Sequence, residues 1–253
     1  MSKPVFFTVA DDNNRKFAEM MEHSLKKFHP DIPLIVYGQK ELDAIPDPQK
    51  FYKMTPLVGR LLLHEYNPVI KLDCDQVITG SLSHVIEDET YDVGVVLNSN
   101  PREVKKFVVQ VWDINPFIYY NCGFVAMRSL EFVEHWWKLC MSQHFPVYQY
   151  REQDFLNILC HYGNYNVKCF DYSDKFHGLA SSSYWNHIEL KEGKLILPPQ
   201  PDGFPDSEKE IRVLHFAGGQ QNNANKMRFD GQFTPEVAKH LKGLVSNGEP
   251  KKG

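Results

Sequence analysis

The chain has 253 residues, of which 42% are hydrophobic and 24% charged, which is typical of a soluble globular protein with one large α/β domain or at most two small ones. The net charge of −4 argues against a dominant nucleic-acid-binding role. The sequence contains no run of 18 apolar residues, so we expect no membrane span. The five cysteines form no Cys-x-x-Cys pair, and the first residues lack the apolar stretch of a signal peptide. We therefore expect reduced thiols and a cytoplasmic location.

The N-terminal segment predicts a β-α-β unit. An apolar run at residues 5–10 has the composition of a strand, and apolar residues at spacings of three and four between Phe17 and Phe28 are typical of a helix. Pro30 and Pro33 end this helix before the next apolar run, at residues 34–37. Two strands joined by a helix at this spacing predict parallel pairing.

The rest of the chain continues the alternation of strands and helices. Residues 39–53 are predicted to be a loop, and Thr55 as N-cap with Pro56 at the first helical position predicts a helix to about residue 66. We expect further strands at residues 68–73, 91–97, 119–127 and 212–216, and helices at residues 101–112, 129–141 and 151–159. The prediction is one α/β domain over residues 1–246, with a central, mostly parallel sheet flanked by helices, and a frayed tail at residues 247–253.

The most informative motif is Asp73-Cys74-Asp75, which follows the apolar run at residues 68–72. Because side chains alternate along a strand, strand geometry that persists to residue 75 would bring both carboxylates to one side. Two carboxylates about 4 Å apart repel by roughly 4 kcal/mol at an effective dielectric near 20, which favours either a cation between them or a proton on one of them. Mg²⁺ and Mn²⁺ suit such oxygen ligands and can hold a phosphorylated substrate. The alternative for the tripeptide alone is a solvated turn.

Four other polar segments could bind a ligand, and each has a structural alternative. Asp11–Asn13 follows a strand and can bind a nucleoside or cap a helix. Asn121-Cys122-Gly123 interrupts a strand and indicates either close approach of a ligand or a β-bulge. Glu152-Gln153-Asp154 opens an amphipathic helix, where the helix dipole alone favours acidic residues. His215 can be a metal ligand or a satisfied core residue.

Taken in chain order, these segments resemble the GT-A glycosyltransferases, most closely the family-8 retaining galactosyl- and glucosyltransferases. The matching segments are Phe7–Asn13, Lys71–Asp75, Tyr120–Gly123, Tyr150–Asn157 and Leu214–Gly218. The resemblance implies a GT-A (nucleotide-diphospho-sugar transferase) fold. It also implies transfer of a hexose from a UDP-sugar to a hydroxyl of a carbohydrate or glycosylated acceptor, with retention of anomeric configuration.

The same resemblance implies roles for individual residues. Asp73, Asp75 and His215 look like the ligands of Mn²⁺, or of Mg²⁺, which would bridge the two phosphates of the donor. The resemblance implies that Asn121, Glu152 and Gln153 surround the transferred sugar and that Asp154 lies next to them. Gln153, Glu152 and Asp154 are the predicted catalytic residues. The implied donor-binding residues are Ala10, Asp11, Asn13, Arg60, Asp73, Cys74, Asp75, Asn121, Gly218 and Lys226.

Three departures from the family pattern stand out. Asn14 is found where related enzymes place an aromatic ring that stacks on uracil. The Lys-Pro-Trp that follows the histidine-glycine motif is missing, and Lys226 is the nearest basic residue. Glu152 replaces the more usual aspartate.

Two rival interpretations stay open. Asp73–Val77 also fits the opening motif of haloacid-dehalogenase-like phosphatases, although the later acidic strand end that such enzymes need is not found in the sequence. The second is a non-catalytic relative that binds sugars or nucleotides, which the retained metal and donor residues argue against. For a transferase, Gln153 is a poor nucleophile, so we expect front-face attack by the acceptor rather than a covalent adduct.

Overall fold

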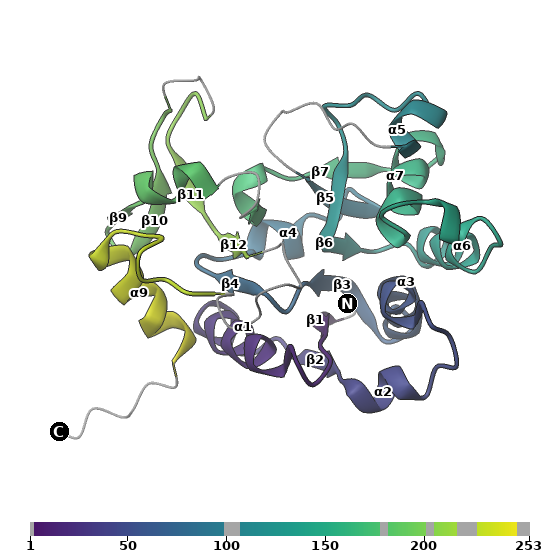
Figure 1. The fold of residues 1–253 in the computed structure, drawn as a ribbon, viewed down its shortest axis with the longest axis horizontal. Coiled ribbons are helices and arrows are strands. Elements are labelled where there is room, and N and C mark those ends of the chain that lie inside the picture. The colour runs from purple at the N-terminus through teal and green to yellow at the C-terminus, as the bar shows by residue number, and fades with distance from the viewer. Residues whose placement is uncertain (1–2, 99–106, 178–181, 201–204, 217–226, 247–253) are drawn as a thin grey trace. The chain divides into compact units, whose positions relative to one another are not determined.

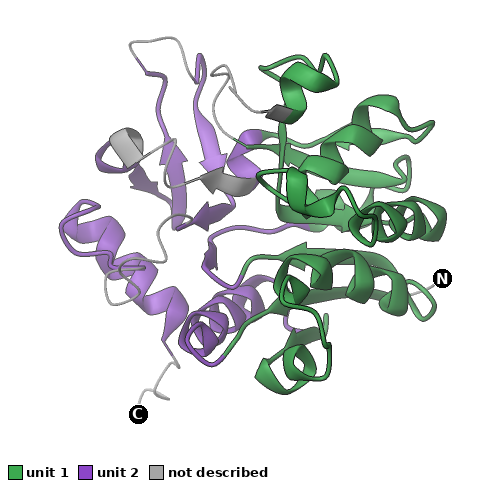
Figure 2. Cartoon of the chain, turned by 45° about the vertical axis from the view of Figure 1, so that its right-hand side comes forward, with its two compact units in different colours: residues 1–11, 32–73, 83–171 green, residues 12–31, 74–82, 172–253 purple. Residues whose placement is uncertain are grey.

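The computed structural model describes residues 3–98, 107–177, 182–200, 205–216 and 227–246. The chain divides into two compact units, each made of separate segments (Figure 2). Unit 1 comprises residues 1–11, 32–73 and 83–171, and unit 2 comprises residues 12–31, 74–82 and 172–253. That these units form the single domain expected over residues 1–246 stays a prediction.

Unit 1 is built on a six-stranded sheet with the order β2-β1-β3-β6-β5-β7 (Figure 1). Its pairs are parallel except the two that β6 makes with β3 and β5, so the predicted mostly parallel sheet is confirmed. The expected β-α-β pairing is also confirmed, because β1 and β2 run parallel. The strands are β1 (Lys3–Val9), β2 (Leu34–Tyr37), β3 (Tyr66–Leu72), β5 (Val93–Leu97), β6 (Tyr120–Met127) and β7 (Val167–Cys169).

Three helices of unit 1, α3, α6 and α7, pack against one another, and α3 and α7 also contact the sheet (Figure 1). The apolar faces of these helices enclose a core that includes Val58, Trp136 and Leu156. Ser129 is the N-cap of α6, since its Oγ accepts a hydrogen bond from the Phe132 N–H at 3.2 Å. The helices of unit 1 are α2 (Gln39–Asp43), α3 (Lys50–Leu62), α4 (Ser83–Glu87), α5 (Phe107–Val111), α6 (Leu130–Cys140) and α7 (Glu152–Tyr162), with a 3₁₀ turn at Phe145–Val147.

One predicted helix start is wrong. Helix α3 begins at Lys50, not at Thr55, and Pro56 lies inside it. The expected loop at residues 39–53 also contains helix α2. An interior proline costs a helix roughly 3 kcal/mol, but Met54, Pro56 and Val58 are all buried. Burial of this face stabilises the longer helix, which local capping preferences do not reveal.

Unit 2 contains two three-stranded sheets, ordered β11-β10-β9 and β4-β12-β8. Helix α1 packs on β4, where its buried Ser24 accepts a hydrogen bond from the Ile78 N–H at 3.0 Å, and α9 packs on α1. The elements are α1 (Arg15–Phe28), β4 (Gln76–Ile78), β8 (Phe176–His177), β9 (Glu189–Lys191), β10 (Lys194–Leu197), β11 (Lys209–Ile211), β12 (Val213–His215) and α9 (Pro235–Val245), with 3₁₀ turns at Tyr172–Lys175 and Ser182–His187.

Within the described ranges, no helix has both the length and the apolar character that a bilayer crossing requires.

Candidate functional site

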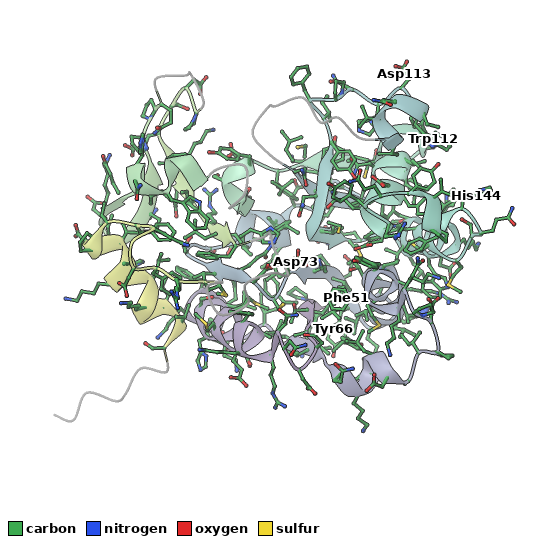
Figure 3. The ribbon with its side chains drawn as sticks, in the orientation of Figure 1. Phe51, Tyr66, Asp73, Trp112, Asp113 and His144 are labelled. Carbon is green, nitrogen blue, oxygen red and sulfur yellow. The ribbon has the colours of Figure 1, made fainter. Side chains whose placement is uncertain are left out.

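The Asp-x-Asp motif lies in a turn, not at the end of an extended strand. Strand β3 ends at Leu72, Cys74 and Asp75 form the turn, and β4 starts at Gln76. Strand geometry therefore does not persist to residue 75, so the condition for aligning the two carboxylates by strand alternation is not met. Figure 3 labels Asp73 where the chain leaves β3. One intervening residue still limits the separation of the two Cα atoms to about 7 Å.

Asp75 and His215 are brought together within unit 2 by the pairing of β4 with β12. These strands are antiparallel, with His215 opposite Gln76, and the Phe216 N–H donates to the Asp75 carbonyl at 2.9 Å. The His215 Nε2 lies 3.2 Å from Asp75 Oδ1, and both residues are buried, at 2% and 7% exposure. A buried carboxylate beside an imidazole is a ligand pair that suits a divalent transition metal.

Lys71, which we did not predict as a site residue, contacts the motif within unit 1. Its buried ammonium donates to Asp73 Oδ1 and to the Cys122 carbonyl, the latter at 2.7 Å. Burial disfavours the ammonium, but the negative charge of Asp73 outweighs this effect and raises the pKa of Lys71. The sequence signal was present, since a lysine within an otherwise apolar strand needs a partner.

The Asn121-Cys122-Gly123 segment lies at a bulge-like break in the register of β5 with β6, called the bulge below. The pairing of β5 with β6 jumps from Val95 opposite Val125 to Val96 opposite Asn121. Two backbone N–H groups of the bulge are bonded by side chains: Gln153 Oε1 accepts from Cys122 N at 3.1 Å and Asn121 Oδ1 accepts from Gly123 N at 2.7 Å. Two residues implied to bind sugar thus also hold the backbone of the bulge.

Asn98, which follows β5, joins Asn121 to Gln153. Its Oδ1 accepts from Asn121 Nδ2 at 2.8 Å and lies 3.5 Å from Gln153 Nε2. Because the amide oxygens of Asn121 and Gln153 are taken by backbone N–H groups, Asn98 fixes the orientation of both amides. Sequence reasoning missed Asn98, which belongs to none of the matching segments.

Glu152 is the most electrostatically perturbed of the predicted catalytic residues. Burial raises its pKa to about 8, against the opposing effects of a backbone hydrogen bond and of Lys71. The Cys122 thiol lies 3.5 Å from its Oε1, and Oε2 has no hydrogen-bond partner among the described residues. At neutral pH the side chain is therefore largely protonated and is a weak nucleophile.

Asp154 is held by structural hydrogen bonds. Its Oδ1 accepts from the Tyr119 hydroxyl at 2.5 Å and its Oδ2 accepts from the Tyr150 N–H at 2.8 Å. Asp154 is 1% exposed. This arrangement fits a role in fixing the start of α7 better than direct contact with a substrate.

Each of the remaining predicted residues has a different local setting. Ala10 is buried and its N–H donates to the Tyr37 carbonyl at 2.9 Å, while Asp11 is half-buried and Asn13 exposed. The Arg60 Nε lies 3.6 Å from Glu134 Oε1 on α6, and Cys74 is buried and forms no disulfide in the described part of the chain. Gly218 and Lys226 lie outside the described residues. The donor-binding roles of this group stay predictions.

Comparison with solved structures defines the fold. The galactosyltransferase LgtC, solved with donor and acceptor sugar analogues, matches with a TM-score of 0.58 and 15% identity over 98% of each chain. GlyE of Streptococcus pneumoniae matches with a TM-score of 0.58 and 12% identity over 97% of this chain and 61% of that one. Mouse xyloside xylosyltransferase 1 matches with a TM-score of 0.51 and 11% identity over 87% and 99%. The chain has the GT-A glycosyltransferase fold, as predicted.

Neither a family model nor a curated protein matches the sequence.

Proposed function

We propose that this protein is a metal-dependent glycosyltransferase that moves a hexose from a UDP-sugar to a hydroxyl of a carbohydrate or glycosylated acceptor, with retention. The observation that carries the proposal is the buried contact between Asp75 and His215, on a chain with the fold of LgtC. Such a pair suits a cation that binds a diphosphate.

The donor set supports a divalent metal. Asp73, Asp75 and His215 offer two carboxylates and one imidazole as a group of potential ligands among the described residues. We assign Mn²⁺ as the ion, with Mg²⁺ as the alternative, because hard oxygen ligands suit both and the imidazole favours the transition metal. When bound, the ion would stabilise the negative charge that develops on the leaving diphosphate.

The side chains near the bulge favour front-face attack over a covalent adduct. Glu152 is largely protonated at neutral pH, and Gln153 is an amide bonded to Cys122 N. Asp154 is bonded to Tyr119 and Tyr150. None of the three offers a free carboxylate as nucleophile. The acceptor oxygen would therefore bond to the anomeric carbon on the face that UDP leaves, while the leaving phosphate takes the acceptor proton.

The test is release of UDP from a panel of UDP-hexoses with Mn²⁺ or with EDTA, together with thermal shifts for the same ligands. A nucleotide at 100 times its Kd adds about 2.7 kcal/mol to the free energy of unfolding. Asp75→Asn should abolish the metal-dependent shift. Asp230→Asn is the matched control and should behave as wild type, because Asp230 pairs with Lys242 at the surface of unit 2.

The outcomes separate the candidate functions. Release of UDP that needs Mn²⁺ supports the transferase, and binding without turnover supports a non-catalytic relative. Release of phosphate from a phosphoester would indicate a phosphatase. An undiminished metal-dependent shift in Asp75→Asn would contradict the metal assignment.

We also propose a cytoplasmic location. All five cysteines lie in the described part of the chain and none forms a disulfide, which fits a reducing compartment. Fractionation of the source cells checks this, and recovery of the protein from an oxidising compartment would contradict it.

A further inference from the structure

Lys71 stands at a position of β3 where its neighbours are apolar. Ile70 and Leu72 are fully buried, and the Lys71 side chain is itself only 6% exposed. Burying an ammonium is unfavourable unless it is paired and hydrogen-bonded. The contacts of its Nζ with Asp73 Oδ1 and the Cys122 carbonyl satisfy that condition.

The bulge in β6 explains why a hydrogen-bond donor is needed beside the Cys122 carbonyl. Cys122 lies in the skipped part of the ladder, where the register pairs it with no residue of β5. On the β3 side, the Lys71 ammonium bonds the Cys122 carbonyl and the Asp73 N–H bonds the Gly123 carbonyl at 2.9 Å. Lys71 and Asp73 therefore hold the bulge together, one through its side chain and one through its backbone.

We propose that Lys71 is a positioning residue of the metal site, which fixes the carboxylate of Asp73 and ties it to the bulge that carries Asn121. The inference rests on the proposed function, because Asp73 is a metal ligand only there. Lys71 belongs to neither the predicted metal ligands nor the predicted donor-binding residues, and it acts through Asp73.

The physical reason is preorganisation. A carboxylate held by a hydrogen-bonded partner loses less side-chain freedom when it binds a cation than one that rotates freely. Partners of this kind typically change metal affinity by 10–100-fold. The positive charge of Lys71 repels a second cation and so weakens metal binding, whereas preorganisation of the Asp73 carboxylate strengthens it. A measurement of metal affinity shows which of these two effects is larger.

The experiment measures Mn²⁺ affinity directly, from free Mn²⁺ by electron paramagnetic resonance, with saturating UDP and no sugar donor. Lys71→Met keeps the length of the side chain and removes both donors, and we expect Mn²⁺ to bind about tenfold more weakly. Lys71→Gln keeps a donor for the Cys122 carbonyl, so it should fold and give an intermediate affinity. Circular dichroism checks the fold of each variant.

Lys53→Met is the matched control. Lys53 is a part-buried lysine of unit 1 that bonds Asp47 at 2.6 Å. Its replacement should lower stability while leaving the Mn²⁺ affinity within twofold of wild type. A loss of Mn²⁺ affinity confined to the Lys71 variants is therefore not a general effect of breaking a lysine–aspartate pair.

Two results would overturn the inference and point to different errors. In the first, wild type binds Mn²⁺ and Asp73→Asn does not, but both Lys71 variants bind Mn²⁺ at least as tightly as wild type. Lys71 is then only a counter-charge to Asp73, and the proposed function stands. If wild type with UDP binds no Mn²⁺, the metal site itself is wrong and this inference falls with it.

Discussion

Replacing Glu152 with glutamine should change how the stability of the protein depends on pH. Glu152 is 9% exposed, and burial raises its pKa from 4.5 to about 8. Glutamine resembles the protonated form in shape and charge. The variant Glu152→Gln therefore removes the cost of ionising a buried carboxyl group and leaves the packing nearly unchanged.

The direction of the pH effect on stability depends on whether the folded or the unfolded state binds the Glu152 proton more tightly. The pKa in the folded state is above that in the unfolded state, so the folded protein holds more protons and its free energy of unfolding falls as pH rises between the two values. At 1.36 kcal/mol for each unit of pKa, the free energy of unfolding of wild type falls by about 4 kcal/mol between pH 5 and pH 8.5 because of Glu152. Below pH 4 the two proteins should have similar pH dependence.

The assay is urea unfolding of wild type and Glu152→Gln at pH 5 and pH 8.5, followed by circular dichroism. The stability advantage of the variant over wild type should grow by about 4 kcal/mol between the two conditions. Glu134→Gln, the same change at a half-buried glutamate of α6 that lies 3.6 Å from Arg60 Nε, is the matched control for the substitution itself. Parallel pH profiles for wild type and Glu152→Gln would refute the reasoning, because they would mean that Glu152 ionises in the folded protein as it does in the unfolded one.

Three further substitutions test individual packing and capping contacts by urea unfolding. Ser129→Ala removes the N-cap of α6 and should lower the free energy of unfolding by about 1 kcal/mol; no change would show that the cap is dispensable. Tyr119→Phe takes the hydroxyl donor from buried Asp154 and should cost about 1–3 kcal/mol, whereas a neutral effect would argue against the structural role of that carboxylate. Gly94→Ala would place a methyl group against the ring of Phe170 and should cost about 1–3 kcal/mol, and wild-type stability would mean that the ring moves away freely.

The sequence by itself determined the order of the main strands and helices of unit 1. Apolar runs such as residues 34–37 and the cap at Ser129 are local signals, because hydrogen bonding and burial along a short segment depend on that segment's own pattern. The order of five polar segments was enough to indicate the GT-A fold. Local signals failed at α3, where burial of Pro56 in the core outweighs the preference of proline for a helix start.

Only the tertiary structure decided how the polar residues are used. Lys71, Asn98 and Asp154 are far apart in the chain, and their roles come from the bulge in β6 and from the start of α7. The contact between Asp75 and His215 likewise depends on the pairing of β4 with β12, strands separated by more than 130 residues. Hydrogen-bond partners are chosen by distances in space, and a sequence pattern reports spacing only along the chain.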